Sequence, residues 1–354
     1  MTGPAQVRWG IMGTANIARA AFLPGLRQAD GTAEAVAGRD GARADQYARE
    51  NGIERAVEGY QRLIEDPDVD ALYIPLPNSL HAEWTIRALR AGKPVLCEKP
   101  LCGTLAETER VLAVAAQTGT LLWEAFVFPF HQQFRRIREL LAQGAIGELR
   151  EIQSSFHFKV GKPDNIRLSA ALEGGALRDV GCYPVRLGRE LFGTEHDSAW
   201  AAAEPGGDGV DIETWGSLGF PGSRRLLLSS GMRRSYDAFS RLMGTDGQIE
   251  ITNPFHPGPA DQFVVRAGRA EPQTYQAAPE EASFTGAIRH INSVIRGDEP
   301  PRLLAVDTSL GTARALHDLA ASSAAQSPSR RPVPVTPPSP VTPPSPTSHR
   351  QAGP

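Results

Sequence analysis

Three side chains that lie far apart in the sequence have the chemistry to move a proton together. Lys99 stands in the segment Glu98-Lys99-Pro100, while Asp179 and Tyr183 are four residues apart and share a face if their segment is helical. A partly desolvated ammonium group polarises a carbonyl and can supply a proton to it. Only four of the 37 basic residues are lysines. Lys99 is therefore a stronger functional candidate than a lysine in a lysine-rich chain would be.

A glycine turn near the N-terminus predicts a dinucleotide site. The run from Gly10 to Ile17, GIMGTANI, follows an apolar segment and precedes a helix-like one. A residue without a side chain lets the backbone approach a pyrophosphate, and the next helix offers free amide groups. Ala15 and Ala18 stand where glycines are often found, so a plain strand-to-helix turn stays open. We expect the cofactor to contact Met12, Gly13, Thr14, Ala15, Asn16 and Ile17.

The end of the next strand-like segment bears on the choice of cofactor. Gly38 and Arg39 stand where an enzyme that uses NAD usually has a carboxylate for the ribose hydroxyl. An arginine suits the 2′-phosphate of NADP instead. Asp40 would take the carboxylate position after a shift of one residue, so NAD remains possible. The pattern favours NADP over NAD.

The elements that must position these residues alternate in type through the first third of the chain. Apolar, strand-like runs are followed by helix-like segments with caps and glycine stops. Strands are expected at 7–12, 33–38, 71–76, 94–97 and 120–124, and helices at 17–28, 43–51, 79–91 and 105–118. This alternation predicts an α/β Rossmann domain over residues 1–125, with a parallel sheet covered on both faces. Lys99 and the segment 76–81 (LPNSLH) then follow strands at their carboxyl ends, where such sheets bind ligands.

The sequence after residue 125 predicts a second domain of α+β type over residues 126–326. A helix is expected at 133–143, and strands at 149–158, 214–220, 224–230, 240–243, 248–251 and 262–266. Two helices close the domain, at 284–296 and 306–323. Such a domain has a largely antiparallel sheet with one open face, which commonly becomes an oligomer interface. Residues 327–354 hold ten of the 29 prolines and a tandem VTPPSP repeat, and we expect a disordered, proline-rich tail.

Composition argues against several classes of partner. The tail contains three arginines and no acid, which leaves 34 basic and 40 acidic residues in the body. A mildly acidic body is a poor match for nucleic acid or anionic lipid, and no apolar run reaches the length of a membrane span. The three cysteines have no metal-type spacing, so we expect no metal and reduced thiols in a cytoplasmic protein.

The order of these motifs resembles the Gfo/Idh/MocA oxidoreductase family across residues 7–323. The resemblance is carried by the Gly13 turn, Pro77-Asn78-Ser79-Leu80-His81, Glu98-Lys99-Pro100, Ala145-Ile146-Gly147-Glu148 and Gly174-Gly175-Ala176 with Asp179 and Tyr183. A tyrosine rather than a histidine four residues after the aspartate resembles the sugar reductases, dihydrodiol dehydrogenases and aldose dehydrogenases. The likeness is greatest to nucleotide-sugar 3-ketoreductases, through Tyr73–Pro77, His81–Trp84, Ile166-Arg167, Asp179–Arg186 and Gly231-Met232 before Tyr236.

This resemblance implies roles for particular residues. Lys99 is implied as the proton donor, alone or together with Tyr183, and both are implied as substrate contacts. The cofactor is expected to contact Tyr60, Leu76, His81, Arg167 and Asp179, in addition to the Gly13 turn, Gly38 and Arg39. The sugar nucleotide is expected to contact Tyr236 and Thr245.

The implied activity is NADPH-dependent reduction of the C3 ketone of a dTDP-linked keto-deoxysugar by a homo-oligomeric enzyme, a dimer or tetramer. An NADP-dependent aldose 1-dehydrogenase or trans-dihydrodiol dehydrogenase is an alternative, because the same acid–base residues serve both directions of reaction. A non-catalytic NADP-binding sensor is a third reading. The presence of both Lys99 and Tyr183 argues against it.

Overall fold

The computed structural model describes residues 6–258, 260–276 and 281–326. The expected tail, residues 327–354, lies outside them. The first sheet has the strand order β3-β2-β1-β4-β5-β6 and all its described pairs are parallel. Its strands are β1 (Val7–Met12), β2 (Gly31–Gly38), β3 (Arg55–Glu58), β4 (Ala71–Ile74), β5 (Val95–Cys97) and β6 (Leu122–Glu124). The expected α/β Rossmann fold is confirmed.

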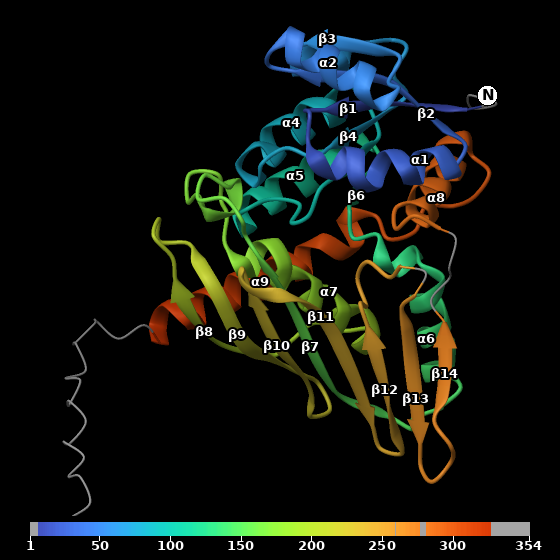
Figure 1. The fold of residues 1–354 in the computed structure, drawn as a ribbon, viewed down its shortest axis with the longest axis vertical. Coiled ribbons are helices and arrows are strands. Elements are labelled where there is room, and N and C mark those ends of the chain that lie inside the picture. The colour runs from blue at the N-terminus through green and yellow to red at the C-terminus, as the bar shows by residue number, and fades with distance from the viewer. Residues whose placement is uncertain (1–5, 259, 277–280, 327–354) are drawn as a thin grey trace, which may run out of the picture.

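Helices connect these strands and cover the sheet (Figure 1). They are the π-helical turn η1 (Ala18–Phe22), α1 (Leu23–Gln28), α2 (Gly41–Asn51), α3 (Tyr60–Glu65), α4 (Asn78–Arg90) and α5 (Leu105–Thr118). Strand β3 and helix α3 were not predicted from the sequence. Strand β3 is a four-residue edge strand with no buried residue, so it lacks the apolar run that marks the inner strands.

The second sheet has the order β14-β13-β12-β11-β7-β10-β9-β8. Its described pairs are antiparallel except for β7 and β10, which run parallel. The strands are β7 (Leu149–Lys159), β8 (Ser198–Pro205), β9 (Asp211–Phe220), β10 (Arg224–Gly231), β11 (Arg233–Gly244), β12 (Gly247–Thr252), β13 (Gln262–Ala267) and β14 (Gln273–Gln276). The expectation of a largely antiparallel sheet is confirmed.

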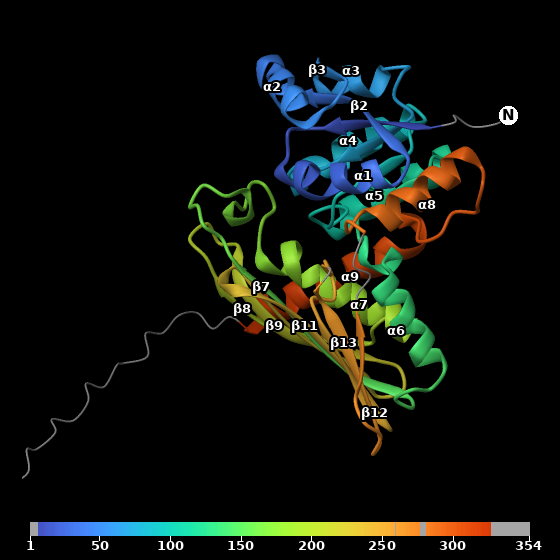
Figure 2. The same ribbon diagram turned by 45° about the vertical axis from the view of Figure 1, so that its right-hand side comes forward.

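Among the described residues, helices cover one face of this sheet and leave the other open. Helices α6 (Gln132–Ala142), α7 (Cys182–Phe192) and α9 (Ala305–Gln326) gather on the covered face (Figures 1 and 2). Short turns η2 (Phe128–Phe130), η3 (Ile166–Leu168) and η4 (Leu177–Gly181) join them to the strands. On outward positions of β8, β9 and β10, Trp200, Trp215 and Leu227 are exposed.

Helix α8 (Thr285–Arg296) corrects the domain boundary expected from the sequence. The sequence placed this segment in the second domain, but its apolar side packs into the core of the first one. Phe284 lies edge-on to Phe22, at 6.0 Å between ring centroids, and Asn292 accepts a buried hydrogen bond of 2.9 Å from the indole of Trp9. The Rossmann sheet presents apolar surface on this side that α1 alone does not cover. The chain therefore returns to it after building the second sheet.

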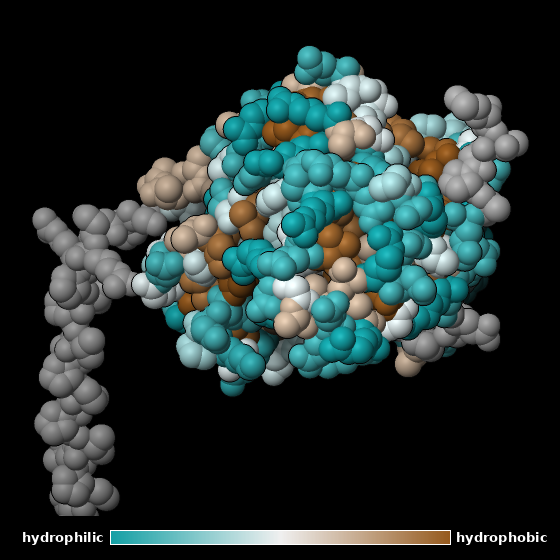
Figure 3. All heavy atoms as spheres, turned by 90° about the horizontal axis from the view of Figure 1, so that it is seen from above, coloured by the Kyte–Doolittle hydropathy of each residue, from teal (hydrophilic) through white to brown (hydrophobic). Residues whose placement is uncertain are grey.

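The surface seen over the first domain is mainly hydrophilic, with its apolar atoms in separate patches (Figure 3). Within the described residues, none of the helices combines the length and the apolarity that a membrane crossing requires.

Candidate active site

A cavity of about 550 Å³ lies where the carboxyl ends of the first sheet face helix η4, helix α7 and the second sheet. Its lining is mostly apolar and includes four charged side chains and two phenols. From the first domain it is lined by Ala15, Asn16, Ile17, Ala20, Pro75, Leu76, Asn78, Glu98, Lys99 and Ala125. The rest of the wall is formed by Phe156, Phe158, Ile166, Arg167, Leu172, Gly174, Asp179, Val180, Tyr183, Tyr236, His256 and Phe284.

The Gly13 turn has the geometry of a dinucleotide cradle. Gly13 has φ +102°, a conformation that favours glycine, and its amide donates to the Ala37 carbonyl at 2.7 Å. A Cβ on Gly13 would come within 3.0 Å of the Leu76 side chain. The turn is held from outside by the Tyr47 hydroxyl, which donates to the Ala15 carbonyl. The residues present thus fit a dinucleotide whose pyrophosphate lies against the backbone of this turn and the start of the next helix.

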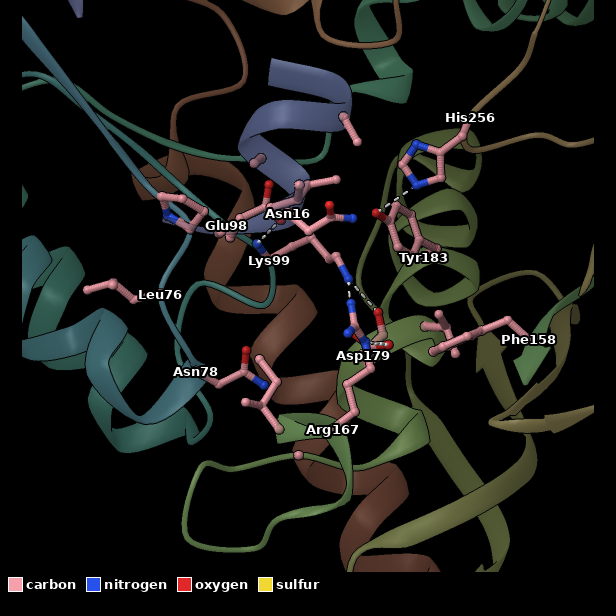
Figure 4. Close-up of a pocket in the computed structure, with 18 of the residues that line it drawn as sticks. Asn16, Leu76, Asn78, Glu98, Lys99, Phe158, Arg167, Asp179, Tyr183 and His256 are labelled. Carbon is pink, nitrogen blue, oxygen red and sulfur yellow. Dashed lines mark hydrogen bonds and ion pairs between the residues drawn. The ribbon is translucent and has the colours of Figure 1, made fainter. Parts of the chain in front are cut away.

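Lys99 projects from the segment after β5 toward the second domain (Figure 4). Its side chain is 11% exposed, and its ammonium group donates to the backbone carbonyl of Asp179 at 2.5 Å. The same nitrogen lies 4.8 Å from the centre of the Tyr183 ring. Burial alone would lower the pKa of Lys99, but Tyr183 and the Asp179 carboxylate together raise it above its ordinary value. Lys99 is therefore a stable cation at neutral pH.

Asp179 joins two cations at this wall. Its carboxylate lies 3.5 Å from the Lys99 nitrogen and accepts a 2.7 Å hydrogen bond from Arg167. Burial acts to raise the pKa of Asp179, but Lys99 and Arg167 outweigh it and hold that pKa below its usual range. Asp179 is thus a carboxylate at neutral pH. It fixes the position of the Lys99 side chain through both its backbone and its side chain.

Tyr183 does not hydrogen-bond to Lys99. Its hydroxyl instead lies 3.0 Å from Nε2 of His256, a residue that the sequence analysis missed (Figure 4). Burial raises the pKa of the Tyr183 phenol against the opposing charge of Lys99. Burial, and then that same charge, lower the pKa of His256 to about 4. At neutral pH the wall therefore presents a cation, a neutral phenol and a neutral imidazole, which suits stabilising and protonating an alkoxide.

The other expected cofactor residues lie near the Gly13 turn or support it from behind. Leu76 lines the cavity, and the Tyr60 hydroxyl faces Gly13. His81 is fully buried instead, with its ring nitrogens 2.8 Å from the Leu76 carbonyl and 3.0 Å from the Pro100 carbonyl. It braces the two segments that carry Leu76 and Lys99. Met12 is fully buried in the core and Thr14 is half-buried, while Gly38 ends β2 and Arg39 is exposed next to it.

One expected substrate residue is wrong. Thr245 does not lie at the cavity, because β11 continues to Gly244 and places the Thr245 hydroxyl on the backbone amide of Glu148. Tyr236, near the start of that strand, does line the cavity. The two residues are nine positions apart along an extended segment, or roughly 30 Å.

Two family models match the chain. The model described as "Oxidoreductase family, NAD-binding Rossmann fold" (GFO_IDH_MocA) covers residues 7–126, and that of the GFO/IDH/MocA C-terminal domain covers residues 134–250. The chain belongs to the Gfo/Idh/MocA oxidoreductase family. Lys99 lies in the region matched by the Rossmann-fold model of the Gfo/Idh/MocA family, and Tyr183 lies in the region matched by its C-terminal-domain model.

Several members of the Gfo/Idh/MocA family are similar over most of the chain. A dTDP-3,4-didehydro-2,6-dideoxy-α-D-glucose 3-reductase of Streptomyces violaceoruber is 38% identical over 301 residues, which is 82% of this chain and 85% of the relative. An NADP-dependent D-xylose 1-dehydrogenase of Haloferax volcanii is 34% identical over 83% of this chain and 91% of its own. The 3-ketoreductase KijD10 of Actinomadura kijaniata, solved with NADP and TDP-benzene, is 34% identical with a TM-score of 0.82, over 90% of this chain and 98% of that one.

Proposed function

We propose that the protein is an NADPH-dependent 3-ketoreductase that acts on a dTDP-linked keto-deoxysugar. The observation that carries this proposal is the shared cavity, in which Lys99 and Tyr183 face the same space as the Gly13 turn. The similarity to KijD10, which was solved with NADP and TDP-benzene, supports this choice of cofactor and substrate.

The roles of the residues follow from their charges. Bound NADPH would supply the hydride for the carbonyl carbon. Lys99 is a cation held 2.5 Å from a backbone carbonyl, so its position is fixed before the substrate arrives. It stabilises the negative charge that develops on the substrate oxygen. Tyr183 is a neutral phenol on the same wall and gives its hydroxyl proton to that oxygen.

The end of β2 supports NADP rather than NAD. The Asp40 carboxylate accepts a 3.0 Å hydrogen bond from the Arg43 amide and caps helix α2, so it already has a structural partner. The exposed guanidinium of Arg39 beside it is available for a 2′-phosphate. The backbone of residues 13–17 would hold the pyrophosphate.

Substrate specificity tests the proposal. We expect the purified protein to oxidise NADPH with a dTDP-3-keto-deoxysugar and not with free sugars, and to have a KM for NADH at least about tenfold higher than for NADPH. Absorbance of the reduced cofactor at 340 nm measures both. Reduction of NADP by free xylose or a trans-dihydrodiol would instead assign a dehydrogenase. Tight NADPH binding without turnover on any of these substrates would assign a sensor.

We also propose that a second copy of the chain covers the open face of the second sheet. Trp200 and Trp215 are each 44% exposed on neighbouring strands, with Leu227 beside them. Large apolar groups on an open face are typical of an interface.

We expect light scattering to give at least twice the 38.1 kDa mass of the chain, and Trp215→Glu to reduce that mass to one copy. The same substitution at Val306, an exposed apolar residue of α9, should leave the mass unchanged. A monomeric parent would refute this interface.

The three cysteines are buried and form no disulfide with one another. This arrangement supports a reducing, cytoplasmic location as part of the proposed function.

A further inference from the structure

His256 lies in the loop that follows β12 and contacts the phenol of Tyr183. Its Nε2 is 3.0 Å from the hydroxyl oxygen, and the two rings are 5.3 Å apart and nearly perpendicular. Figure 4 shows the imidazole and the Lys99 side chain approaching Tyr183 from different sides. Tyr183 is only 5% exposed, and the rings of Phe126, Phe156 and Phe255 pack against its ring.

The loop that carries His256 is fixed by one asparagine. Asn253 has φ +50°, and its side-chain amide donates to the His256 carbonyl at 2.6 Å and to the Asp261 carboxylate at 2.9 Å. Its amide oxygen accepts from the Tyr236 hydroxyl at 2.9 Å. Pro254 and Pro257, the residue directly after the histidine, restrict the backbone further. The contact between His256 and Tyr183 is therefore built into the loop.

The direction of this hydrogen bond determines what the phenol can do. A hydroxyl has one hydrogen, and a Tyr183 that donates it to His256 has none to offer a substrate. A neutral imidazole carries its hydrogen on one of two nitrogens. If Nε2 carries it, the imidazole donates to the phenol oxygen, and the phenol hydrogen is left to point into the cavity.

We propose that His256 is a positioning residue that donates a hydrogen bond from Nε2 to the Tyr183 oxygen and directs the phenol hydrogen toward the substrate. The catalytic part of this role rests on the proposed ketoreductase function. When the Tyr183 O–H bond breaks and the substrate O–H bond forms, a phenolate is left. The His256 N–H stabilises that phenolate until water returns the proton. A hydrogen bond to a developing charge corresponds to about a 10- to 100-fold effect on turnover.

A double-mutant cycle tests the coupling between the two residues. We expect His256→Ala to lower kcat for the keto-sugar about 10- to 100-fold with less than about a threefold change in KM for NADPH. His256→Gln should have a kcat much closer to that of the parent than His256→Ala has, since the terminal amide of glutamine can donate to the phenol. In a Tyr183→Phe background, His256→Ala should reduce kcat less than about twofold further. A loss of equal size in both backgrounds would overturn the proposal.

His157 supplies the matched control. It lies on β7 between the cavity residues Phe156 and Phe158, but its Nε2 contacts Ser229 at 2.8 Å rather than Tyr183. His157→Gln should keep kcat within about twofold of the parent. A loss as large as that of His256→Ala would show that any histidine replacement on this sheet impairs turnover, and would remove the support for a specific role.

The tautomer of His256 can be measured without turnover. Nitrogen-15 NMR of the histidine-labelled protein at pH 7 should show a neutral ring protonated at Nε2, assigned by the signal that disappears in His256→Gln. A ring protonated only at Nδ1, or a charged ring, would contradict the proposed hydrogen bond. If the parent reduces no ketone, the function proposed above is wrong, and this spectrum still decides the direction of the bond.

Discussion

Lys99→Met should lower the turnover number for ketone reduction about a thousandfold while NADPH binds nearly as before. Methionine is one atom shorter and keeps much of the apolar stem of the side chain, but it removes the cation that faces the cavity. The developing alkoxide then loses its closest positive charge, and Asp179 loses one of its two partners. Single-turnover absorbance measurements give the chemical step, and quenching of protein fluorescence gives the affinity for NADPH.

Lys93, which lies just before β5, provides a matched control. Lys93 and Lys99 flank opposite ends of β5, and both ammonium groups donate to backbone carbonyls, those of Asp66 and Val69 in the case of Lys93. Only Lys99 lines the cavity. Lys93→Met should cost stability but keep kcat within about threefold of the parent. Turnover by Lys99→Met at the parent rate would remove Lys99 from the mechanism.

Asp179→Asn should have the second largest effect, and on two properties at once. Asparagine keeps the shape of the side chain but leaves the Lys99 and Arg167 cations without their carboxylate. Because Arg167 is 41% exposed and partly screened, we expect a loss of about 2–3 kcal/mol in the free energy of unfolding at pH 7. Turnover should fall about 10- to 100-fold, since the Lys99 side chain loses its alignment. Urea denaturation and steady-state kinetics measure the two losses.

The stability difference between parent and Asp179→Asn should depend on pH with a definite sign. The pKa of Asp179 is lower in the folded protein than in the unfolded chain. The stabilisation by the Asp179 carboxylate is therefore fully present above the pKa of the unfolded chain, about 3.9. It is lost as pH falls through the lower pKa that Asp179 has in the folded protein. Asp68→Asn is the control, because Asp68 is 60% exposed in its ion pair with Arg8 and should contribute less than about 1 kcal/mol. A pH-independent difference for Asp179→Asn would mean that its charge is not the cause.

The first sheet and much of the site could be predicted because their signals are local. Apolar runs mark β1, β4 and β5, and the residues after such strands meet at one edge of a parallel sheet. Lys99 and the Gly13 turn could therefore be placed near one another from their positions alone. Which donor Tyr183 contacts could not be predicted in this way.

The residues that were missed or misplaced depend on tertiary structure. His256 meets Tyr183 across 73 positions of sequence, and its local surroundings indicate only a rigid, proline-flanked turn. Thr245 was expected at the sugar nucleotide only through the family resemblance, and the sequence marks only residues 240–243 of β11 as a strand. Residues 233–239 form part of the strand as well, through pairing with β7, and carry its far end away from the cavity.

The return of α8 to the first core delays the folding of the growing chain. When residue 126 has been made, all six strands of the first sheet are present, but Phe284 and the helix after it are not. At roughly 5–20 residues per second, the next ~170 residues occupy about 10–30 s of synthesis. Throughout that interval the apolar surface around Trp9 and Phe22 lacks its cover. The unfinished chain on the ribosome, rather than the completed enzyme, is then the form most exposed to aggregation and most dependent on chaperones.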